Sequence, residues 1–185
     1  MVSLLDAALE YARSGIQIAP LWPRSKEPLR GFGNDQPSSD EIIIRYWWDR
    51  CPQANIGIPT GKKYNSLVIL DLDFNSKEGV DGETTLNSIM KTNGIVLPRT
   101  AISKTGSGGK HIYFRIPNTI KIETTKSIKL GIDIVSEGAH VVAPPSVHNC
   151  GRRYEWKEGS IRTIADATNA VFQLIQLIQK YESKT

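Results

Sequence analysis

Four segments of the chain carry apolar residues at the spacing of an amphipathic helix. In the last segment apolar residues recur every three or four positions, as Val171 and Ile178 illustrate. Residues that commonly cap helices stand before the other three, at Ser3, Asp40 and Asp81. The pattern therefore predicts helices over Leu4–Arg13, Glu41–Arg50, Glu83–Thr92 and Ala165–Tyr181.

Short apolar runs between these segments are typical of buried strands. Two pairs of runs are separated only by short turns, which predicts two hairpins. Their strands are Ala101–Lys104 with Lys110–Ile116, and Ile132–Val135 with His140–Ala143. The other predicted strands are Ile16–Leu21, Asn55–Pro59, Ser66–Phe74 and Arg153–Trp156. Helices at both ends of the chain and hairpins in its middle indicate the α+β class.

Composition adds little to this picture. The 185 residues, 39% hydrophobic and 23% charged, suit one globular domain over residues 1–185. The 23 basic and 19 acidic side chains leave a net charge of +4, which is compatible with a polyanionic partner. No apolar run approaches the ~20 residues that span a bilayer, and we recognise no signal peptide, so no membrane association is expected. Two cysteines, Cys51 and Cys150, favour reduced thiols and a cytoplasmic protein.

The strand around Leu70 ends in two carboxylates, Asp71 and Asp73. Side chains alternate across a strand, so both carboxylates point to one face, while Leu70 and Leu72 point to the other. Two carboxylates on one face repel each other, and a divalent cation that takes hard oxygen ligands, Mg²⁺ or Mn²⁺, relieves the repulsion. A pair that only caps or turns the chain has the same pattern, so this motif alone leaves both interpretations open.

A third carboxylate, Asp133, lies inside the apolar run Gly131–Val135, with isoleucine on either side. A buried charge needs a partner, because an unpaired one is costly in free energy. A metal already held by Asp71 and Asp73 would be such a partner, and a nearby lysine or arginine would be another. We expect the metal, with all three aspartates as catalytic ligands.

Three glycines occur within Thr105–His111, which reads Thr-Gly-Ser-Gly-Gly-Lys-His. Glycines let backbone amides approach an anion closely, and the lysine and histidine after them suit a triphosphate. The segment is not a P-loop, because Lys104 stands where glycine is required, and a plain hairpin turn is the alternative. His111 could instead bind zinc, but no zinc is expected, because the other candidate ligands lack the spacing of a zinc site. These are Cys51, Cys150, His140 and His148.

Basic residues occur in three segments that are expected to be irregular. Trp22–Pro37 is rich in proline and glycine and carries Arg24 and Lys26. Lys62 lies in a predicted turn, and Lys126 lies in a lysine-rich stretch. These residues would contact nucleic-acid phosphates through charge rather than sequence. A solvated surface without a partner is the alternative for such lysines.

Five motifs occur in an order that resembles a known family. They are Asn55-Ile-Gly-Ile-Pro-Thr-Gly61, Val68-Ile-Leu-Asp-Leu-Asp73, Thr105-Gly-Ser-Gly-Gly-Lys-His-Ile-Tyr-Phe114, Gly131-Ile-Asp-Ile134 and Val141-Val-Ala-Pro-Pro-Ser-Val-His148. From about Leu4 to Trp156 the chain is similar to the bifunctional primase-polymerase (Prim-Pol) domain of the archaeo-eukaryotic primase superfamily. No single motif is specific, but five in this order are.

The resemblance implies an archaeo-eukaryotic-primase-like catalytic core, in which a recognition-motif-like sheet is joined to a smaller αβ unit. It implies that Asp71, Asp73 and Asp133 hold two catalytic Mg²⁺ or Mn²⁺ ions. It also implies a group of residues around the triphosphate and sugar of a bound nucleotide. This group comprises Ser107, Gly108, Lys110, His111, Ser146 and His148.

The implied function is template-directed nucleotidyl transfer by a DNA primase and DNA polymerase, which extends strands on a single-stranded template and can initiate them. Its partners would be single-stranded DNA, a primer, nucleoside triphosphates, and a helicase in cis or in trans. Initiation needs a second nucleotide site, for which preformed basic loops are suited. The candidates for nucleic-acid or second-nucleotide contact are Arg24, Lys26, Lys62 and Lys126. The chain would be one Prim-Pol domain, alone or at the N-terminus of a longer replication protein.

The chain departs from the family pattern at two points. Many relatives carry Arg-Gly-Asp-Gly-Gly after the third aspartate, where this chain has Val135-Ser-Glu-Gly-Ala139. Some relatives insert a zinc-binding stem before the motif histidine, whereas only Lys110 separates Gly109 from His111 here. These differences put in doubt any contact made by that arginine and any role of a zinc stem in initiation.

Other classes of protein share parts of this pattern. A haloacid-dehalogenase-type phosphatase also has Asp-x-Asp after a strand, but it needs threonine or valine where this chain has Asn75. A polymerase-β-type nucleotidyltransferase places Gly-Ser before Asp-x-Asp, whereas Gly106 and Ser107 follow it here. A non-catalytic single-strand-binding module is the third alternative. Metal-dependent nucleotide incorporation distinguishes the polymerase from the phosphatase and from the binding module, and the order of the motifs distinguishes it from the polymerase-β type.

Overall fold

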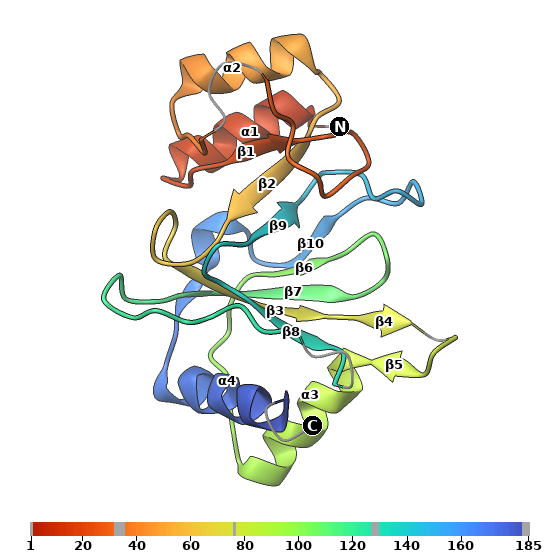
Figure 1. Ribbon diagram of the computed structural model, residues 1–185, viewed down its shortest axis with the longest axis vertical. Coiled ribbons are helices and arrows are strands. Elements are labelled where there is room, and N and C mark those ends of the chain that lie inside the picture. Colours follow the sequence, from red (N-terminus) through yellow and green to blue (C-terminus); the bar gives the residue numbers. More distant parts are fainter. Residues whose placement is uncertain (1, 32–35, 76, 127–129, 183–185) are drawn as a thin grey trace.

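The computed structural model describes residues 2–31, 36–75, 77–126 and 130–182 as an elongated arrangement of helices and sheets (Figure 1). Two helices lie at one end, two lie at the other, and the strands lie between them. Apart from one short parallel pairing, neighbouring strands in the sheets run antiparallel. This mixed architecture is consistent with the predicted α+β class.

The helices begin where the sequence places capping residues. Side chains of Ser3, Asp40 and Asp81 each accept a hydrogen bond from a first-turn amide, as predicted. The helices are α1 (Leu4–Arg13), α2 (Glu41–Arg50), α3 (Gly82–Asn93), the short 3₁₀ helix η1 (Ile161–Thr163) and α4 (Asn169–Glu182). In the described part of the chain, no helix has the length and apolar character needed to cross a membrane.

The start predicted for the last helix was wrong. Ala165–Asp166 forms strand β11, which pairs in parallel with β7 (Lys110–Arg115), and α4 begins only at Asn169. The amide of Ala167 still donates to the carbonyl of Arg115, at 2.8 Å. Backbone pairing with the sheet thus outweighs the helical spacing of the apolar residues at this end.

The strands form a small N-terminal sheet, a larger central sheet and a two-stranded ribbon. The small sheet has the order β1 (Ala19–Leu21), β2 (Asn55–Pro59), β9 (His140–Ala143). The central sheet has the order β10 (Glu155–Glu158), β6 (Ile102–Lys104), β7, β3 (Leu67–Leu72), β8 (Ile132–Val135), with β11 beside β7. The ribbon joins β4 (Phe74–Asn75) to β5 (Val80–Asp81) directly after β3.

One predicted hairpin is confirmed and the other is wrong. Strands β6 and β7 pair around the glycine loop, as predicted. Strands β8 and β9, although joined by a four-residue turn, enter different sheets: β8 pairs with β3, and β9 pairs with β2. The turn is held at the end of β2 by Thr60, whose amide donates to Ala139 (3.0 Å) and whose hydroxyl donates to Ser136 (2.6 Å). The chain therefore crosses between the two sheets at this point.

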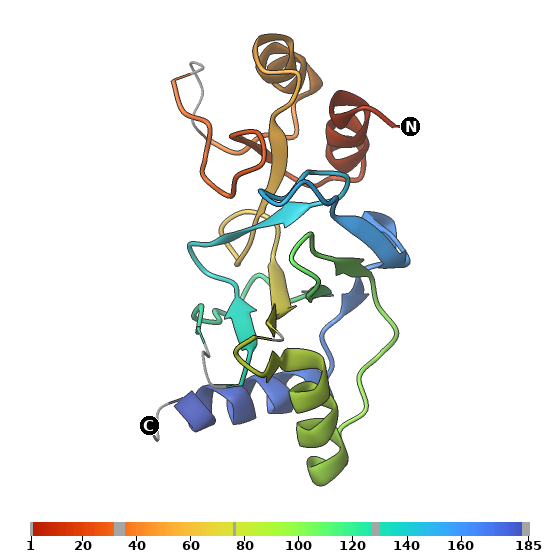
Figure 2. The same cartoon turned by 90° about the vertical axis from the view of Figure 1, so that its right-hand side faces the viewer.

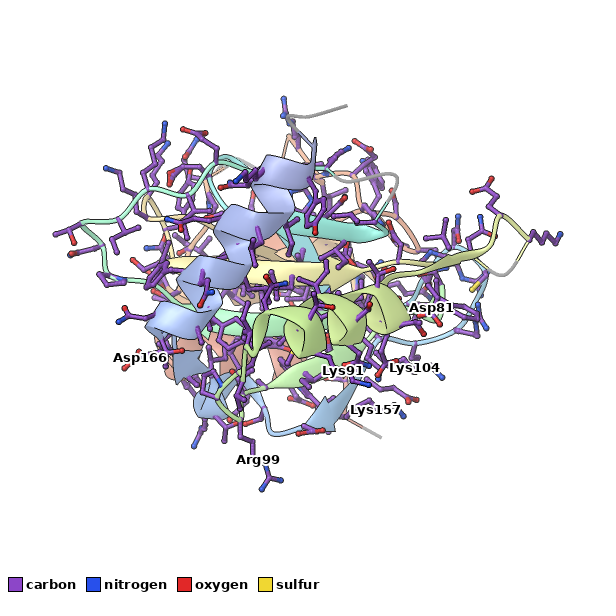
Figure 3. The ribbon with its side chains drawn as sticks, turned by 90° about the horizontal axis from the view of Figure 1, so that it is seen from below. Asp81, Lys91, Arg99, Lys104, Lys157 and Asp166 are labelled. Atoms are coloured by element: carbon purple, nitrogen blue, oxygen red, sulfur yellow. The ribbon has the colours of Figure 1, made fainter. Side chains whose placement is uncertain are left out.

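Strand β3 lies between two apolar cores. On one face, Leu67 and Ile69 pack with α1, α2 and the small sheet. On the other face, Val68, Leu70 and Leu72 pack with α3 and α4, which cover that face together (Figures 2 and 3). Toward the end of the first face the apolar core gives way to the aspartates, so the carboxylates lie where the two sheets diverge.

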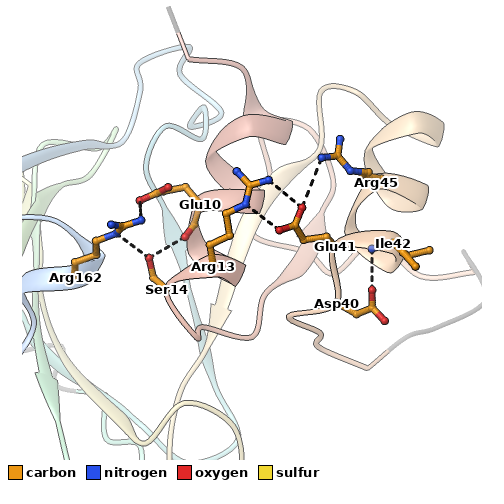
Figure 4. Close-up of polar contacts among 8 residues, drawn as sticks. All are labelled: Glu10, Arg13, Ser14, Asp40, Glu41, Ile42, Arg45 and Arg162. Atoms are coloured by element: carbon orange, nitrogen blue, oxygen red, sulfur yellow. Dashed lines mark hydrogen bonds and ion pairs between the residues drawn. The ribbon is translucent and has the colours of Figure 1, made fainter.

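Exposed polar contacts connect α1 with α2 and with η1 (Figure 4). Arg13 pairs with Glu41 at 2.8 Å, and Arg162 pairs with Glu10 at 2.6 Å. Exposed ion pairs contribute little to stability, because water and salt screen them. The apolar core beneath α1 and α2 is therefore the main attachment of this unit to the central sheet.

Candidate active site

The register of the central sheet brings three predicted site residues into one row. Asp71 on β3 lies directly opposite Asp133 on β8, and on its other side it lies directly opposite His111 on β7. His111 in turn lies opposite Ser103 on β6. Directly paired residues present their side chains on the same face of a sheet. The sequence predicts two carboxylates and a histidine near one another, and the register shows how they meet.

Asp73 lies just beyond the end of β3, where its backbone is fixed on both sides. Its amide donates to the carbonyl of Gly131 (2.8 Å), and its carbonyl accepts from the amide of Gly82 (2.9 Å). A Cβ atom on Gly82 would lie 2.0 Å from the Gly131 carbonyl oxygen, so only glycine permits this approach. Asp73 is therefore held beside Asp133, and both line one pocket of about 360 Å³. Phe74, Ser107 and Lys126 also line this carboxylate pocket.

A second pocket, of about 210 Å³, lies against Asp71 and His111. Lys26 and Tyr154 line it, and they also line a third pocket of about 320 Å³ that includes Arg24 and His148. The loop that carries Lys26 is attached to β9, because the Lys26 carbonyl lies 2.8 Å from Nε2 of His140. Lys26 thus lies between the Asp71 pocket and a more distant basic pocket.

The carboxylates are held in an unfavourable electrostatic setting. Burial is the main cause that raises the pKa of Asp71 to about 6; the charge of Lys26 opposes this shift, and the charge of Asp133 contributes to it. Partial burial and the charge of Asp71 also raise the pKa of Asp73. Raised pKa values mean that the ionised carboxylates lack sufficient positive charge around them. A divalent cation would supply that charge.

The donor set fits a cation that also takes ligands from substrate and water. Within the described ranges, no three His, Cys, Asp or Glu side chains converge into a complete metal-binding group. The opposed pair Asp71 and Asp133, with Asp73 beside it, supplies carboxylate oxygens only. Mg²⁺ typically binds through one or two carboxylates and completes its coordination with water and phosphate oxygens. The arrangement therefore suits Mg²⁺ or Mn²⁺ better than a metal enclosed by protein ligands.

His111 is buried and electrically neutral. Its Nε2 atom lies 3.5 Å from Oδ1 of Asp71, and 4% of the residue is exposed. Burial, together with the nearby charge of Lys26, lowers the pKa of His111 to about 3, while the charge of Asp73 opposes the shift. The ring can therefore donate one hydrogen bond toward a bound anion, but it does so without a positive charge.

The glycine loop is a tight turn pressed against the end of β3. The amide of Thr105 donates to Gly109 (2.9 Å), and the amide of Gly108 donates to Thr105 (3.1 Å). A Cβ atom on Gly109 would lie 2.1 Å from the carbonyl oxygen of Leu72. This close approach places the exposed side chain of Ser107 at the carboxylate pocket.

His148 packs against the glycine loop from the other side. A Cβ atom on Gly106 would lie 2.1 Å from Cβ of His148. The Nδ1 atom of His148 lies 3.0 Å from Sγ of Cys150. Hydrogen bonds from Arg152 and His148 lower the pKa of the Cys150 thiol to about 6. The segment that carries these residues thus supports the loop and lies beside the basic pocket.

Three residues in the predicted site groups lie away from the row of aspartates. Lys110 pairs with Glu83 of α3, on the face of β7 opposite His111. Ser146 has no exposed surface, and its hydroxyl accepts a hydrogen bond from the amide of Ile56 (2.8 Å), so it fixes the segment after β9 to β2 rather than facing a pocket. Lys62 is exposed on the turn after β2, and its amide donates to Glu137 (2.8 Å).

The structure adds residues that the sequence reasoning missed. Tyr113, two positions after His111, shares its face of β7 and lies within hydrogen-bond distance of its ring, at 3.3 Å. Strand alternation could have revealed this neighbour. Ser103 and Tyr154 join the site only through strand pairing and chain reversal, for which the sequence carries no local signal. Phe74, 49% exposed directly after Asp73, is an aromatic residue whose exposure could not be read from its hydrophobicity.

A comparison with protein families identifies a family whose model covers most of the chain. The family described as bifunctional DNA primase/polymerase, N-terminal, matches residues 8–170. The matched segment contains all three aspartates and His111. A comparison with the curated proteins found no match.

Proposed function

The chain belongs to the bifunctional DNA primase/polymerase (Prim-Pol) family, and we propose that it extends a primer by template-directed, divalent-metal-dependent nucleotidyl transfer. Membership implies DNA primase or polymerase activity in general. The observation that carries the finer proposal is the register that sets Asp71 opposite Asp133, with Asp73 held beside them. Paired carboxylates on rigid strands keep their positions before metal or substrate arrives.

Asp71, Asp73 and Asp133 would hold two Mg²⁺ or Mn²⁺ ions in this proposal. When bound, such ions activate the primer 3′-hydroxyl and neutralise the triphosphate and its pyrophosphate leaving group. The chain itself contributes the placement of the oxygen ligands. Burial of Asp71 strengthens its attraction to a cation, because opposite charges interact more strongly where water is excluded.

The triphosphate would lie between the pocket lined by Asp71 and the pocket lined by Asp73 and Asp133. Ser107 and Lys126 line the pocket on the Asp73 side, and Lys26 and His111 line the pocket on the Asp71 side. Lysines supply charge, the Ser107 hydroxyl and the neutral His111 ring supply hydrogen bonds, and the glycine loop allows close approach. Arg152 steadies the loop by donating from Nη2 to the Ser107 carbonyl (3.1 Å).

A single-stranded DNA template would leave the site along a trough of about 510 Å³. The trough shares Pro28 and His140 with the Asp71 pocket, so the two spaces adjoin. Arg30, Lys63 and Tyr64 line it. Basic groups suit the phosphates of a single strand, and an aromatic ring suits base stacking.

Weak initiation is a second proposed activity, favoured by the position of Lys26. Lys26 lies between the Asp71 pocket and the basic pocket with Arg24, where a second triphosphate could bind. The test supplies unprimed single-stranded template and labelled nucleotides. Short products from the wild type, lost in Arg24→Ala while primed extension continues, would support this role. Without unprimed products in Mg²⁺ or Mn²⁺, only the primer-dependent activity would stand.

Two assays distinguish the proposed class of reaction from its alternatives. Labelled nucleotide should be added to a primer on single-stranded template in the presence of Mn²⁺ or Mg²⁺, and the addition should stop with a chelator. A phosphatase would instead release inorganic phosphate from a monoester without extending the primer. Tight binding of single-stranded DNA with no incorporation in either metal would replace the proposal with a non-catalytic binding module.

A further inference from the structure

Phe74 follows Asp73 directly and keeps about half of its surface in water. It is 49% exposed, and it belongs to none of the apolar cores formed by the described residues. A single exposed apolar side chain is common and needs no explanation by itself, as the 79% exposed Val96 illustrates. Phe74 differs from Val96 in its position, because it lines the carboxylate pocket that contains Asp73 and Asp133.

The backbone around Phe74 is held from two directions. Asp73, on one side, is fixed by two backbone hydrogen bonds. On the other side, Phe74 pairs with Asp81 in the β4–β5 ribbon, and the Asp81 carboxylate caps α3 by accepting from the amide of Thr84 (3.0 Å). The ring is therefore attached to a backbone that is positioned before any ligand binds, which lowers the conformational entropy lost on contact.

The glycine loop approaches this ring at a residue without a side chain. A Cβ atom on Gly108 would lie 3.5 Å from Cδ1 of Phe74, and the φ angle of Gly108, 114°, disfavours any other residue there. The loop therefore reaches the ring without covering it with a side chain at this position. Ser107, the preceding residue, is exposed and lines the same pocket as Phe74.

The carboxylate pocket has a polar part and an apolar part. The carboxylates, Ser107 and Lys126 supply the polar part, and Phe74 and Val80 supply the apolar part. A nucleotide is divided in the same way, into charged phosphates and a flat base with two apolar faces. The volume of about 360 Å³ falls within the range of ~300–1,000 Å³ that is typical of small-ligand sites. Phosphates at the aspartates would thus leave the base of the same nucleotide close to the ring of Phe74.

We infer that Phe74 binds a nucleobase by stacking, at the nucleotide whose phosphate lies at the aspartates. Every base has a π-face, so such a contact adds affinity without selecting a sequence. The base belongs either to the incoming nucleoside triphosphate or to the last nucleotide of the primer. The inference rests on the proposed function, because a base reaches this pocket only if nucleotides bind at the aspartates.

Three variants isolate the contribution of the ring. Phe74→Leu keeps an apolar side chain and removes the aromatic face, whereas Phe74→Tyr keeps the ring. Tyr46→Leu is the matched control, because Tyr46 is another exposed aromatic residue, and α2, which carries it, lies at the end of the molecule away from the β4–β5 ribbon (Figure 1). The ring of Tyr46 contacts Arg50, whose guanidinium carbon lies 3.6 Å from the ring centroid.

The first test compares a nucleotide with a counterpart that lacks a base. Isothermal titration calorimetry in Mg²⁺, without primer or template, measures the Kd for a deoxynucleoside triphosphate and for inorganic tripolyphosphate. Phe74→Leu should raise the Kd for the nucleotide at least about fivefold, the lower value for loss of a base–aromatic stack, and leave the Kd for tripolyphosphate unchanged. Phe74→Tyr and Tyr46→Leu should match the wild type for both ligands.

A second arm treats the primer in the same way. Fluorescence anisotropy in Mg²⁺, without nucleotide, compares a primer–template with one whose last primer nucleotide lacks its base. A loss of base-dependent affinity in Phe74→Leu in the first arm alone assigns the base to the incoming nucleotide, and a loss in the second arm alone assigns it to the primer terminus. If Phe74→Leu keeps the preference for the ligand with a base in both arms, or weakens tripolyphosphate as much as the nucleotide, the inference is overturned.

Photochemical cross-linking tests the wild type itself and does not depend on the folding of a variant. On irradiation, 5-iodouracil forms a covalent bond with an aromatic side chain that is stacked on it. Wild type irradiated with the 5-iodouracil nucleotide, or with a primer that ends in 5-iodouracil, should carry the cross-link at Phe74 in peptide mass spectra. Cross-links that form only at other residues would overturn the inference.

Primer extension separates failure of this inference from failure of the proposed function. If the wild type extends primers but Phe74→Leu keeps its full base-dependent affinity, the inference fails alone. If the wild type binds nucleotide with an affinity that depends on Phe74 but incorporates none, the stacking contact stands and the polymerase activity fails.

Discussion

Asp71 on β3 and Asp133 on β8 lie directly opposite each other in one antiparallel pair, so two carboxylates share a face of the central sheet. Each is flanked along its strand by residues that are buried in the apolar core. An apolar pair at these positions would be expected to pack at lower cost, because buried like charges repel. Such a cost in stability is common where a site is arranged to bind a ligand.

Replacing Asp71 with asparagine should stabilise the metal-free protein at pH 7. Burial raises the pKa of Asp71 from 3.8 to about 6, so the native state disfavours the ionised form. The penalty is absent below about pH 4, grows between about pH 4 and 6, and is constant above that range at roughly 3 kcal/mol at most. Thermal unfolding in chelator should show a higher Tm for Asp71→Asn at pH 7 and a smaller difference at pH 4.

Asp166→Asn is the matched control, because Asp166 (labelled in Figure 3) is exposed on β11 and pairs with Arg115, which lies opposite Leu67 at the other end of β3 from Asp71. Its Tm should equal that of the wild type at both pH values. A lower Tm for Asp71→Asn at pH 7 would contradict the predicted penalty.

Metal ions should raise the Tm of the wild type more at pH 7 than at pH 5. A proton and a cation compete for Asp71, and its pKa of about 6 places that competition between these two pH values. The measurement compares Tm with chelator and with Mn²⁺ at each pH, and Asp71→Asn should lose most of the shift at pH 7. Equal shifts in wild type and Asp71→Asn would place the metal elsewhere.

The aspartates and His111 could be predicted from sequence because their signals are local. Strand alternation assigns Asp71 and Asp73 to one face, and the embedded Asp133 needs a partner wherever its strand pairs. The same alternation places Lys110 and His111 on opposite faces of their strand. The position of Lys110 away from the aspartates could therefore also have been predicted.

Other features depend on pairing between distant strands and could not be read from local sequence. The turn Ser136–Ala139 has the length of a hairpin turn, but β9 pairs with β2 and not with β8. Ser146 lies in a family motif, yet its environment is determined by the amide of Ile56, 90 positions earlier. Lys26 lines the pocket at Asp71 because its loop contacts His140 of β9, 114 positions later in the chain.

Single-stranded DNA should bind through charge along the trough that contains Lys63. The affinity should fall steeply with salt, with a slope near 0.7 for each phosphate neutralised on a single strand. Lys63→Ala should reduce the slope by about that amount, whereas Lys91→Ala, on the exposed surface of α3, should not (Figure 3). Binding that ignores salt, or equal slopes for both variants, would rule out this surface.

Cys150 should react with iodoacetamide at a lower pH than an ordinary thiol. Hydrogen bonds from the Arg152 backbone and from His148 lower its pKa to about 6, and the thiolate is the reactive form. Mass spectrometry of alkylated peptides should give a half-maximal rate near pH 6, and His148→Ala should move this midpoint upward. Cys51, the other free thiol, serves as the internal comparison. A midpoint near 8.5, the ordinary thiol value, would contradict the arrangement.

Primer extension under single-turnover conditions, with saturating Mn²⁺ and single-stranded template, tests whether the opposed aspartates perform the reaction. Wild type and Asp166→Asn should extend the primer at the same rate. Asp71→Asn and Asp133→Asn should extend the primer at a rate at least about 10²-fold lower, as expected when groups that stabilise transition-state charge are removed. Both variants should remain folded. Extension at the wild-type rate by either variant would show that Asp71 and Asp133 do not form the catalytic centre.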